Sequence, residues 1–138
     1  MIVLDTSGII AAYNRREPAF EASHQLLTTT DQPIVMSPLV LAEVDYLADK
    51  YLGTSAAVTL LRELERIATV ASFANADLRD ATDLVERYAD LRIGLTDAVN
   101  VVLAGRYKTT RLLTLDDHYR VIRPLHGAAF DMLPARPR

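Results

Sequence analysis

Four acidic residues of this 138-residue chain occupy positions from which a carboxylate can bind a metal ion or act in catalysis: Asp5, Glu43, Asp97 and Asp116. They are far apart in sequence, so they share a site only if the fold brings them together. Clustered carboxylates repel one another, and divalent cations offset that repulsion. A site built from oxygen ligands suits Mg²⁺ or Mn²⁺ rather than zinc, and such a site can activate a water molecule and stabilise charge on a phosphodiester.

Glu43 is the acid that an ordinary surface position explains least well. On a helix, Leu39 and Leu47 lie one turn before and after it, with Val40 and Tyr46 beside them. The pattern therefore predicts that Glu43 lies within the apolar arc of its helix and faces the core. A buried carboxylate needs a cation, hydrogen-bond donors or a raised pKa. Pairing with a nearby arginine is the structural alternative.

The other three acids each have a structural alternative as well. Asp5 follows the apolar run at residues 2–4, where turn and cap residues are common. Asp97 lies in the first turn of an apolar helix, whose N-terminus stabilises a carboxylate by about 0.3–1 kcal/mol without any metal. Asp116 and Asp117 both follow an apolar run, and either residue can cap the next turn. We assign Asp116 to the site because it is nearer to the strand end, and Asp117 to the cap.

Several polar neighbours of these acids are candidates for supporting roles. Asn100 follows Asp97 by three residues and shares its helix face. Thr114 has the same strand parity as Asp116. The remaining supporting candidates are Thr6 and Ser7, either of which can cap the helix after Asp5, and Asp117.

Short apolar runs alternate with helical patterns along the whole chain. This alternation predicts a single three-layer α/β domain over residues 1–138, with a mainly parallel sheet and a frayed tail at 134–138. Ligands of such sheets bind beyond the carboxyl ends of the strands, which is where Asp5 and Asp116 fall. The predicted strands are residues 2–4, 34–36, 69–73, 111–115 and 128–133. The predicted helices span residues 7–13, 18–27, 38–52, 54–67, 76–93 and 97–108, with Ser37, Asn75 and Thr96 as N-caps.

Composition excludes several classes of site. There is no cysteine, so disulfides, thiolate zinc sites and a cysteine nucleophile are ruled out, and a reducing cytoplasm is the expected location. No run approaches the roughly 20 apolar residues of a membrane span, and the start of the chain lacks the pattern of a signal peptide. The net charge of −3 argues against tight non-specific binding of nucleic acid.

The histidines and basic residues carry weaker signals. His24, His118 and His126 lack the spacing of metal ligands, and we expect structural or solvated roles for them. The basic residues that could contact RNA phosphates are Arg15, Arg16, Arg106, Lys108 and Arg111.

Four ordered motifs give the chain a resemblance to a known family. They are Val3-Leu-Asp5-Thr-Ser, Ser37-Pro-Leu-Val-Leu-Ala-Glu43-Val, Gly94-Leu-Thr-Asp97-Ala and Leu113-Thr-Leu-Asp116. Together they resemble the PIN-domain family, and most closely the VapC toxins of bacterial toxin–antitoxin pairs, over essentially the whole chain.

The resemblance implies both an activity and partners. It implies an endoribonuclease that depends on Mg²⁺ or Mn²⁺ and cleaves tRNA or ribosomal RNA with a metal-activated water. By position, Asp5, Glu43, Asp97 and Asp116 match the family's four catalytic acids, and Asp5, Asp97 and Asp116 are the expected metal ligands. A homodimer and a VapB-like antitoxin are implied too, with no direct binding of DNA in the absence of the antitoxin.

Two points stay open at this stage. The doubled acid Asp116-Asp117 departs from the family pattern and leaves the fourth acid uncertain by one residue. The alternative function is a non-catalytic PIN-like scaffold that binds RNA or protein. The presence of all four acids argues against that alternative.

Overall fold

A computed structural model describes residues 1–136 and contains a five-stranded sheet in the order β3-β2-β1-β4-β5. All four strand pairs are parallel, so the carboxyl ends of the strands lie at one edge of the sheet. The strands are β1 (Ile2–Leu4), β2 (Ile34–Met36), β3 (Thr69–Val70), β4 (Arg111–Leu113) and β5 (Asp131–Leu133). The helices are α1 (Thr6–Tyr13), α2 (Phe20–Thr29), α3 (Pro38–Leu52), α4 (Thr54–Ile67), α5 (Asn75–Arg87) and α6 (Leu95–Arg106), with short 3₁₀ helices η1 (Ala89–Leu91) and η2 (Asp117–Arg120).

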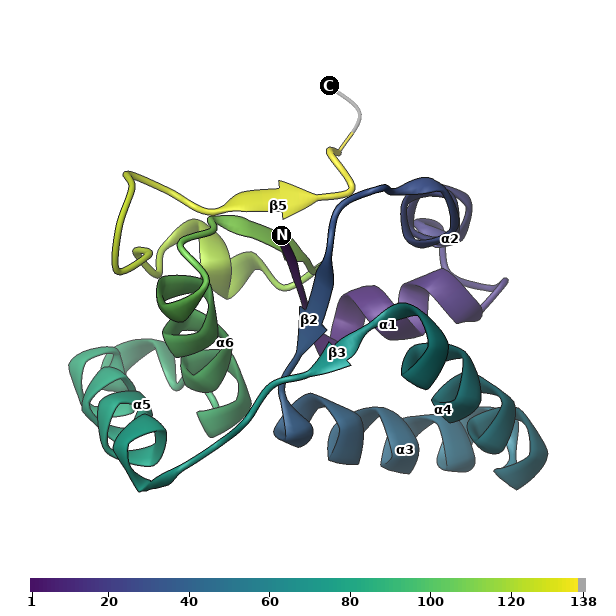
Figure 1. Cartoon of the computed structure of the whole chain (residues 1–138), viewed down its shortest axis with the longest axis horizontal. Helices are drawn as coiled ribbons and strands as arrows, with labels where there is room; N and C mark the ends of the chain where they lie inside the picture. The colour runs from purple at the N-terminus through teal and green to yellow at the C-terminus, as the bar shows by residue number, and fades with distance from the viewer. Residues whose placement is uncertain (137–138) are drawn as a thin grey trace.

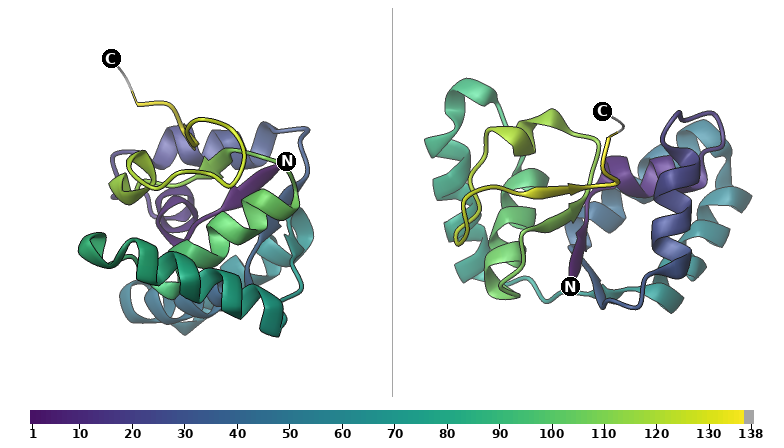
Figure 2. Two further views of the ribbon diagram at one scale, coloured as in Figure 1. Left: turned by 90° about the vertical axis from the view of Figure 1, so that its left-hand side faces the viewer. Right: turned by 90° about the horizontal axis from the view of Figure 1, so that it is seen from above.

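Both faces of the sheet are covered by helices, which confirms the predicted three-layer fold (Figures 1 and 2). Val3 and Leu112 pack into the core on the side of α5 and α6. Leu4, Met36 and Leu113 pack into the second core, on the side of α1 to α4. Because successive side chains of a strand point to opposite faces, only uninterrupted apolar strands such as β1 and β2 satisfy both cores.

Helix α3 begins and ends where its sequence indicates. Ser37 is its N-cap, and the hydroxyl accepts a hydrogen bond from the backbone N–H of Leu39 at 3.0 Å. Pro38 occupies the first turn, where its missing N–H costs nothing. Gly53 ends the helix with φ of 89°, a left-handed conformation that glycine adopts without strain.

Three predicted helix caps are wrong by one or two residues. Helix α1 begins at Thr6 with Asp5 at its N-cap position, so neither Thr6 nor Ser7 caps it. Helix α6 begins at Leu95 with Gly94 as its N-cap, so Thr96 lies inside the first turn. The carboxylate of Asp97 reaches back and accepts a hydrogen bond from the N–H of Gly94 at 3.2 Å. The side chain that satisfies the helix end therefore comes from within the helix. Asn75 is likewise the first residue of α5 and not its cap.

Three strands are shorter than the apolar runs that predicted them. Strand β4 stops at Leu113: the N–H of Thr114 still donates to Leu133 of β5 at 3.0 Å, but the N–H of Leu115 donates to the Ser7 hydroxyl at 2.9 Å. The predicted frayed tail is partly anchored, since Arg136 contacts Asp117 at 3.0 Å, while residues 137–138 lie outside the described part of the chain. Within residues 1–136, no helix has both the length and the apolar character needed to cross a membrane.

The first turn of α1 packs directly on the end of β4. A Cβ atom added to Gly8 would lie 2.3 Å from the carbonyl oxygen of Leu113, so this contact requires glycine. The close approach sets the residues after β1 beside the residues after β4. It therefore places Asp5 and Ser7 next to Thr114 and the segment that follows.

Candidate active site

An open cleft of about 370 Å³ lies at the carboxyl edge of the sheet, where the predicted acids meet. Asp5 comes from the end of β1, Glu43 from α3, Asp97 from α6 and Asp116 from the segment after β4. We call this the acidic cleft; it is lined by Asp5, Thr6, Ser7, Ile10, Glu17, Glu43, Leu47, Asp97, Leu115 and Asp116.

Asp5 is the buried centre of the site. Asp5 is only 3% exposed. One carboxylate oxygen accepts hydrogen bonds from the hydroxyls of Thr114 at 2.7 Å and Ser7 at 2.9 Å, and the other accepts from the amide of Asn100 at 3.1 Å. Burial raises the pKa of Asp5 to about 6, and the charge of Asp97 adds to this rise while the Thr114 hydrogen bond opposes it.

The network around Asp5 explains the supporting residues better than capping does. Ser7 was a predicted helix cap, but it donates to Asp5 and accepts from the N–H of Leu115. Thr114 likewise donates to Asp5, and it accepts from the N–H of Asp116 at 3.0 Å. These hydroxyls hold the ends of β1 and β4 together and fix the orientation of the Asp5 carboxylate.

Asp97 lies at the N-terminus of α6 and faces the same cleft. Besides the N–H of Gly94, it has Tyr119 as a partner, whose hydroxyl lies 3.3 Å from the carboxylate. Burial raises the pKa of Asp97, and the charge of Asp116 contributes in the same direction, although the Gly94 hydrogen bond opposes both. Two carboxylates therefore meet here with hydrogen-bond partners but with no lysine or arginine paired to either of them among residues 1–136.

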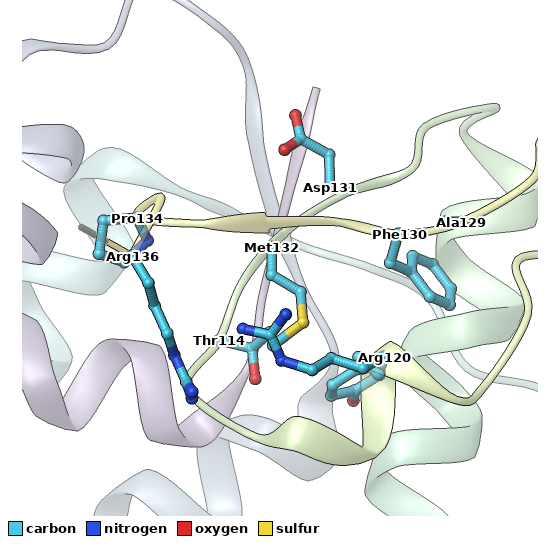
Figure 3. Close-up of a pocket in the computed structure, with 9 residues that line it drawn as sticks. Thr114, Arg120, Ala129, Phe130, Asp131, Met132, Pro134 and Arg136 are labelled. Carbon is cyan, nitrogen blue, oxygen red and sulfur yellow. The ribbon is translucent and has the colours of Figure 1, made fainter. Parts of the chain in front are cut away.

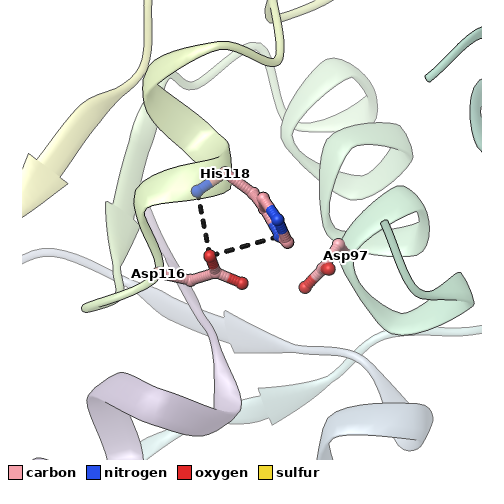
Figure 4. Close-up of side chains that lie close together, drawn as sticks. All are labelled: Asp97, Asp116 and His118. Atoms are coloured by element: carbon pink, nitrogen blue, oxygen red, sulfur yellow. Dashed lines mark hydrogen bonds and ion pairs between the residues drawn. The ribbon is translucent and has the colours of Figure 1, made fainter. Parts of the chain in front are cut away.

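Asp116, and not Asp117, faces the other acids. Asp97, Asp116 and His118 each offer a ligand atom within 4.8 Å of the others, from α6 and from the segment at the start of η2 (Figure 4). The prediction that Asp117 caps this turn is wrong, because Asp116 accepts the hydrogen bond from the N–H of His118 at 2.9 Å. Asp117 is exposed and points to two arginines instead.

His118 is a site residue that the sequence did not identify. Its Nδ1 lies 3.4 Å from a carboxylate oxygen of Asp116. The sequence feature that could have identified His118 is its position two residues after Asp116, an acid at the carboxyl end of a strand. Tyr119, which is almost fully buried, was missed too. Its hydroxyl accepts a hydrogen bond from the amide of Asn100 at 3.1 Å and donates one to Asp97, so it connects these two residues.

Glu43 does not face the core, contrary to the sequence-based prediction. The residue is exposed at the mouth of the cleft, where its carboxylate accepts a hydrogen bond from the Thr6 hydroxyl at 3.3 Å. The buried stripe of α3 runs through Val40, Val44 and Ala48, one position away from Glu43. Asp5 and Glu43 line the cleft but lie outside the 4.8 Å cluster found among the described residues.

The donor set fits a divalent cation. Within residues 1–136, no lysine or arginine forms an ion pair with Asp5, Asp97 or Asp116. Uncompensated carboxylates at close range call for a bound cation. Their oxygens suit Mg²⁺ or Mn²⁺, and His118 adds a nitrogen, a ligand type that transition-metal ions accept.

Two of the basic residues considered as RNA contacts lie away from the acids. Arg106 ends α6 and pairs with Asp77 at 2.6 Å, whereas the acidic cleft lies at the other end of this helix. Arg111 starts β4 and pairs with Asp131 at 3.5 Å, at the amino edge of the sheet. Cations close to the cleft come instead from the segment after β4 and from the end of the described chain.

Comparison with known proteins agrees with the fold. A family model described as the PIN domain matches residues 2–123. The chain is 38% identical to ribonuclease VapC26 of Mycobacterium tuberculosis over 135 residues, which cover 96% of this chain and 100% of VapC26.

Two solved structures share the fold at lower identity. The crystal structure of Mycobacterium tuberculosis VapC20, a toxin that cleaves the sarcin–ricin loop, has a TM-score of 0.77 at 19% identity and covers 85% of this chain and 91% of that one. VapBC2 from Rickettsia felis, bound to a DNA fragment from its promoter, has a TM-score of 0.70 at 20% identity over 96% of this chain and 98% of that one. The family match and the identity to VapC26 together show that the chain belongs to the PIN-domain family, in its VapC group.

Proposed function

We propose that this chain is the toxin of a VapBC-type toxin–antitoxin pair and cleaves RNA endonucleolytically with a divalent cation, Mg²⁺ or Mn²⁺. Its similarity to a protein described as a ribonuclease supports the activity. The substrate class is tRNA or ribosomal RNA, and the sarcin–ricin-loop cleavage attributed to VapC20 supports the ribosomal choice.

One observation carries the proposal: carboxylates from three separate elements meet in the acidic cleft without a lysine or arginine partner among residues 1–136. A scaffold that only binds would gain nothing from keeping these charges together. The cost of burying Asp5 beside Asp97, visible in the raised pKa of both, is offset when a cation binds.

Asp5, Asp97 and Asp116 are the residues that would hold the cation. When bound, a divalent cation lowers the pKa of a water molecule and stabilises negative charge on the phosphodiester. Glu43, exposed at the mouth of the cleft and contacted by Thr6, is placed to accept a hydrogen bond from a water molecule there.

The remaining polar residues position these acids. Ser7, Thr114 and Asn100 use three hydrogen bonds to fix both oxygens of Asp5. Tyr119 links Asn100 to Asp97, so the carboxylates of Asp5 and Asp97 are oriented by one connected network. Such partners of a metal ligand typically affect metal affinity or activity by about 10–100-fold.

Cleavage of labelled tRNA and ribosomal RNA by the purified chain tests the proposal. Activity should be lost in excess EDTA and return with Mg²⁺ or Mn²⁺. Asp97→Asn should lower kcat/KM by at least about a hundredfold, since a ligand matters no less than its hydrogen-bond partners. Asp83→Asn, an exposed acid on α5, is the matched control and should be active. Full activity in EDTA would overturn the metal mechanism, and RNA binding without any cleavage would favour the scaffold.

The antitoxin is a further part of the proposal. VapBC2 of Rickettsia felis, which shares this fold, is a toxin–antitoxin complex on promoter DNA. We propose that a VapB-like partner inhibits this chain in the cytoplasm, and that the chain without its partner does not bind DNA. Expression alone should arrest growth, and Asp5→Asn should relieve the arrest. Equal toxicity of the Asp5 variant would show that the arrest does not come from the acidic cleft.

A homodimer is the proposed oligomeric state. Large apolar side chains of α3 and α4 are exposed, which is uncommon for a free surface when they are contiguous. Light scattering should give twice the chain mass, and Tyr51→Glu should shift it to the mass of one chain. A single-chain mass for the unaltered protein contradicts the proposal. The exposed residues are Tyr46, Tyr51, Leu52 and Val58.

A further inference from the structure

A second hollow, of about 380 Å³, lies beside the acidic cleft on the side of η2 and β5 (Figure 3). This volume is at the small end of the range for ligand pockets, about 300–1,000 Å³. We call it the arginine hollow, and it is lined by Thr114, Tyr119, Arg120, Ala129, Phe130, Asp131, Met132, Pro134 and Arg136.

Two arginines at this hollow are held by one acid. Arg120 Nε and a terminal nitrogen of Arg136 lie 2.9 Å and 3.0 Å from the same oxygen of Asp117. Arg136 also donates to the carbonyl of Leu115 at 3.3 Å. Each guanidinium has five N–H donors, and these contacts use only part of them. Two cations and one carboxylate leave a net positive charge at the rim, and both arginine side chains are about half exposed.

The apolar part of the lining comes from part-exposed Met132 and from Phe130 and Tyr119, which are almost wholly buried. The Phe130 ring meets the Tyr119 ring edge to face, with 5.7 Å between centroids, and the Met132 side chain extends toward Arg120 (Figure 3). Asp131 points to the opposite side of β5, as strand alternation requires, and its carboxylate pairs with Arg111. Phosphate-binding donors therefore lie beside a small apolar surface that Met132 offers to a base.

Two residues that line the arginine hollow hydrogen-bond to acids of the acidic cleft. Tyr119 lines the hollow, and its hydroxyl hydrogen-bonds to Asp97 in the cleft. Thr114 lines the hollow, while its hydroxyl donates to Asp5. A ligand in the hollow therefore lies one side chain away from Asp5 and Asp97.

We propose that the arginine hollow binds one nucleotide of the RNA strand next to the phosphate that reaches the acids. Arg120 and Arg136 bind its phosphate, and the base lies against Met132. This inference rests on the proposed function, since it assumes an RNA substrate. An acidic cleft repels a polyanion, so cations beside it are needed to hold the strand in place. Asp117 pairs with both guanidinium groups and orients them, and this is the role of the second acid of the Asp116-Asp117 pair.

Anisotropy of a fluorescein-labelled, mixed-sequence single-stranded RNA of ten nucleotides tests this inference. The Asp97→Asn background keeps the strand intact in Mg²⁺ buffer. Adding Arg120→Gln and Arg136→Gln should weaken binding about tenfold or more and reduce the slope of log Kd against log salt by about 0.7, the contribution of one phosphate contact on a single strand. The matched control adds Arg66→Gln and Arg79→Gln, which remove the same charge from exposed positions of α4 and α5. It should change neither quantity by more than about a quarter of these effects.

The outcomes separate the subsite from the function on which it rests. If the background protein binds the RNA and the Arg120/Arg136 variant binds it equally well, or no worse than the control, the subsite is wrong while the nuclease proposal stands. If the background protein does not bind any RNA, the proposed function fails. In a protein with Asp97 restored, Mn²⁺ binding of the Arg120/Arg136 variant should equal that of the unaltered chain. A loss of Mn²⁺ affinity would show that the arginines support the acidic cleft, and it would overturn the assignment to RNA.

Discussion

The acidic cleft and the arginine hollow border the same segment after β4, yet they hold their aspartates in opposite ways. In the cleft, burial raises the pKa of Asp5 to about 6. In the hollow, hydrogen bonding to Arg120 lowers the pKa of the exposed Asp117. A carboxylate without a cationic partner is arranged to receive a cation, whereas one that already has two presents a positive rim to an anion.

Asp116 and Asp117 show the same contrast in adjacent residues. Asp116 caps η2 and turns its carboxylate toward Asp97 and His118. Asp117 points away and pairs with Arg120 and Arg136. The comparison teaches that a doubled acid at a strand end can serve two neighbouring sites, one for a metal ion and the other for the arginines that hold a phosphate.

The largest expected effect is on the stability of the metal-free protein, because Asp5 is buried. Its raised pKa means that the folded protein holds this proton more tightly than the unfolded chain does. The stabilisation is therefore complete below about pH 4 and is lost as the pH rises through about 6, a change of about 3 kcal/mol. In EDTA, urea unfolding should show this loss between pH 4 and pH 7, and Asp5→Asn should remove most of it. Parallel pH profiles for the two proteins would contradict the account of the cleft.

A smaller effect is expected from the residues that orient Asp5. Thr114→Val removes the 2.7 Å hydrogen bond without changing the shape of the side chain much, and kcat should fall about 10–100-fold. Thr82→Val on α5 is the matched control, because its hydroxyl donates to a helix carbonyl at an exposed site, so kcat should be unchanged. An unchanged kcat for Thr114→Val would show that Asp5 needs no positioning.

The smallest expected effect separates the two adjacent acids. Asn caps helices about as well as Asp, so Asp116→Asn should be more stable than Asp116→Ala by about 1 kcal/mol. At position 117 the Asn and Ala variants should melt together, since Asp117 caps nothing, and any loss relative to Asp117 should disappear at high salt. A difference in stability between the Asn and Ala variants at position 117, with no such difference at position 116, would show that Asp117 is the cap.

Much of the fold was predictable because its strands are buried on both faces. Apolar runs at Ile2–Leu4 and Ile34–Met36 gave the strands directly, and the alternation of elements gave the parallel sheet and its functional edge. That edge was enough to bring Asp5 and Asp116 into one cleft.

The failures have physical causes. The apolar arc proposed for Glu43 included Tyr46, whose ring remains 64% exposed, while the small residue Ala48 makes the buried contact. Counting tyrosine as a core residue rotated the arc toward Glu43. His118 and Tyr119 were missed because they lie in a 3₁₀ helix of only four residues, which is too short to show a periodic pattern of apolar residues in the sequence.

The central claim, that the acidic cleft holds a divalent cation, is tested most directly by Mn²⁺ binding followed by electron paramagnetic resonance. The unaltered chain should bind Mn²⁺, and Asp97→Asn should weaken the binding at least about tenfold because it removes a carboxylate that pairs with no lysine or arginine in the described part of the chain. Asp117→Asn should bind Mn²⁺ as the unaltered chain does, since its carboxylate already pairs with arginines. Equal Mn²⁺ affinity in the unaltered chain and Asp97→Asn, or a loss confined to Asp117→Asn, would contradict the account.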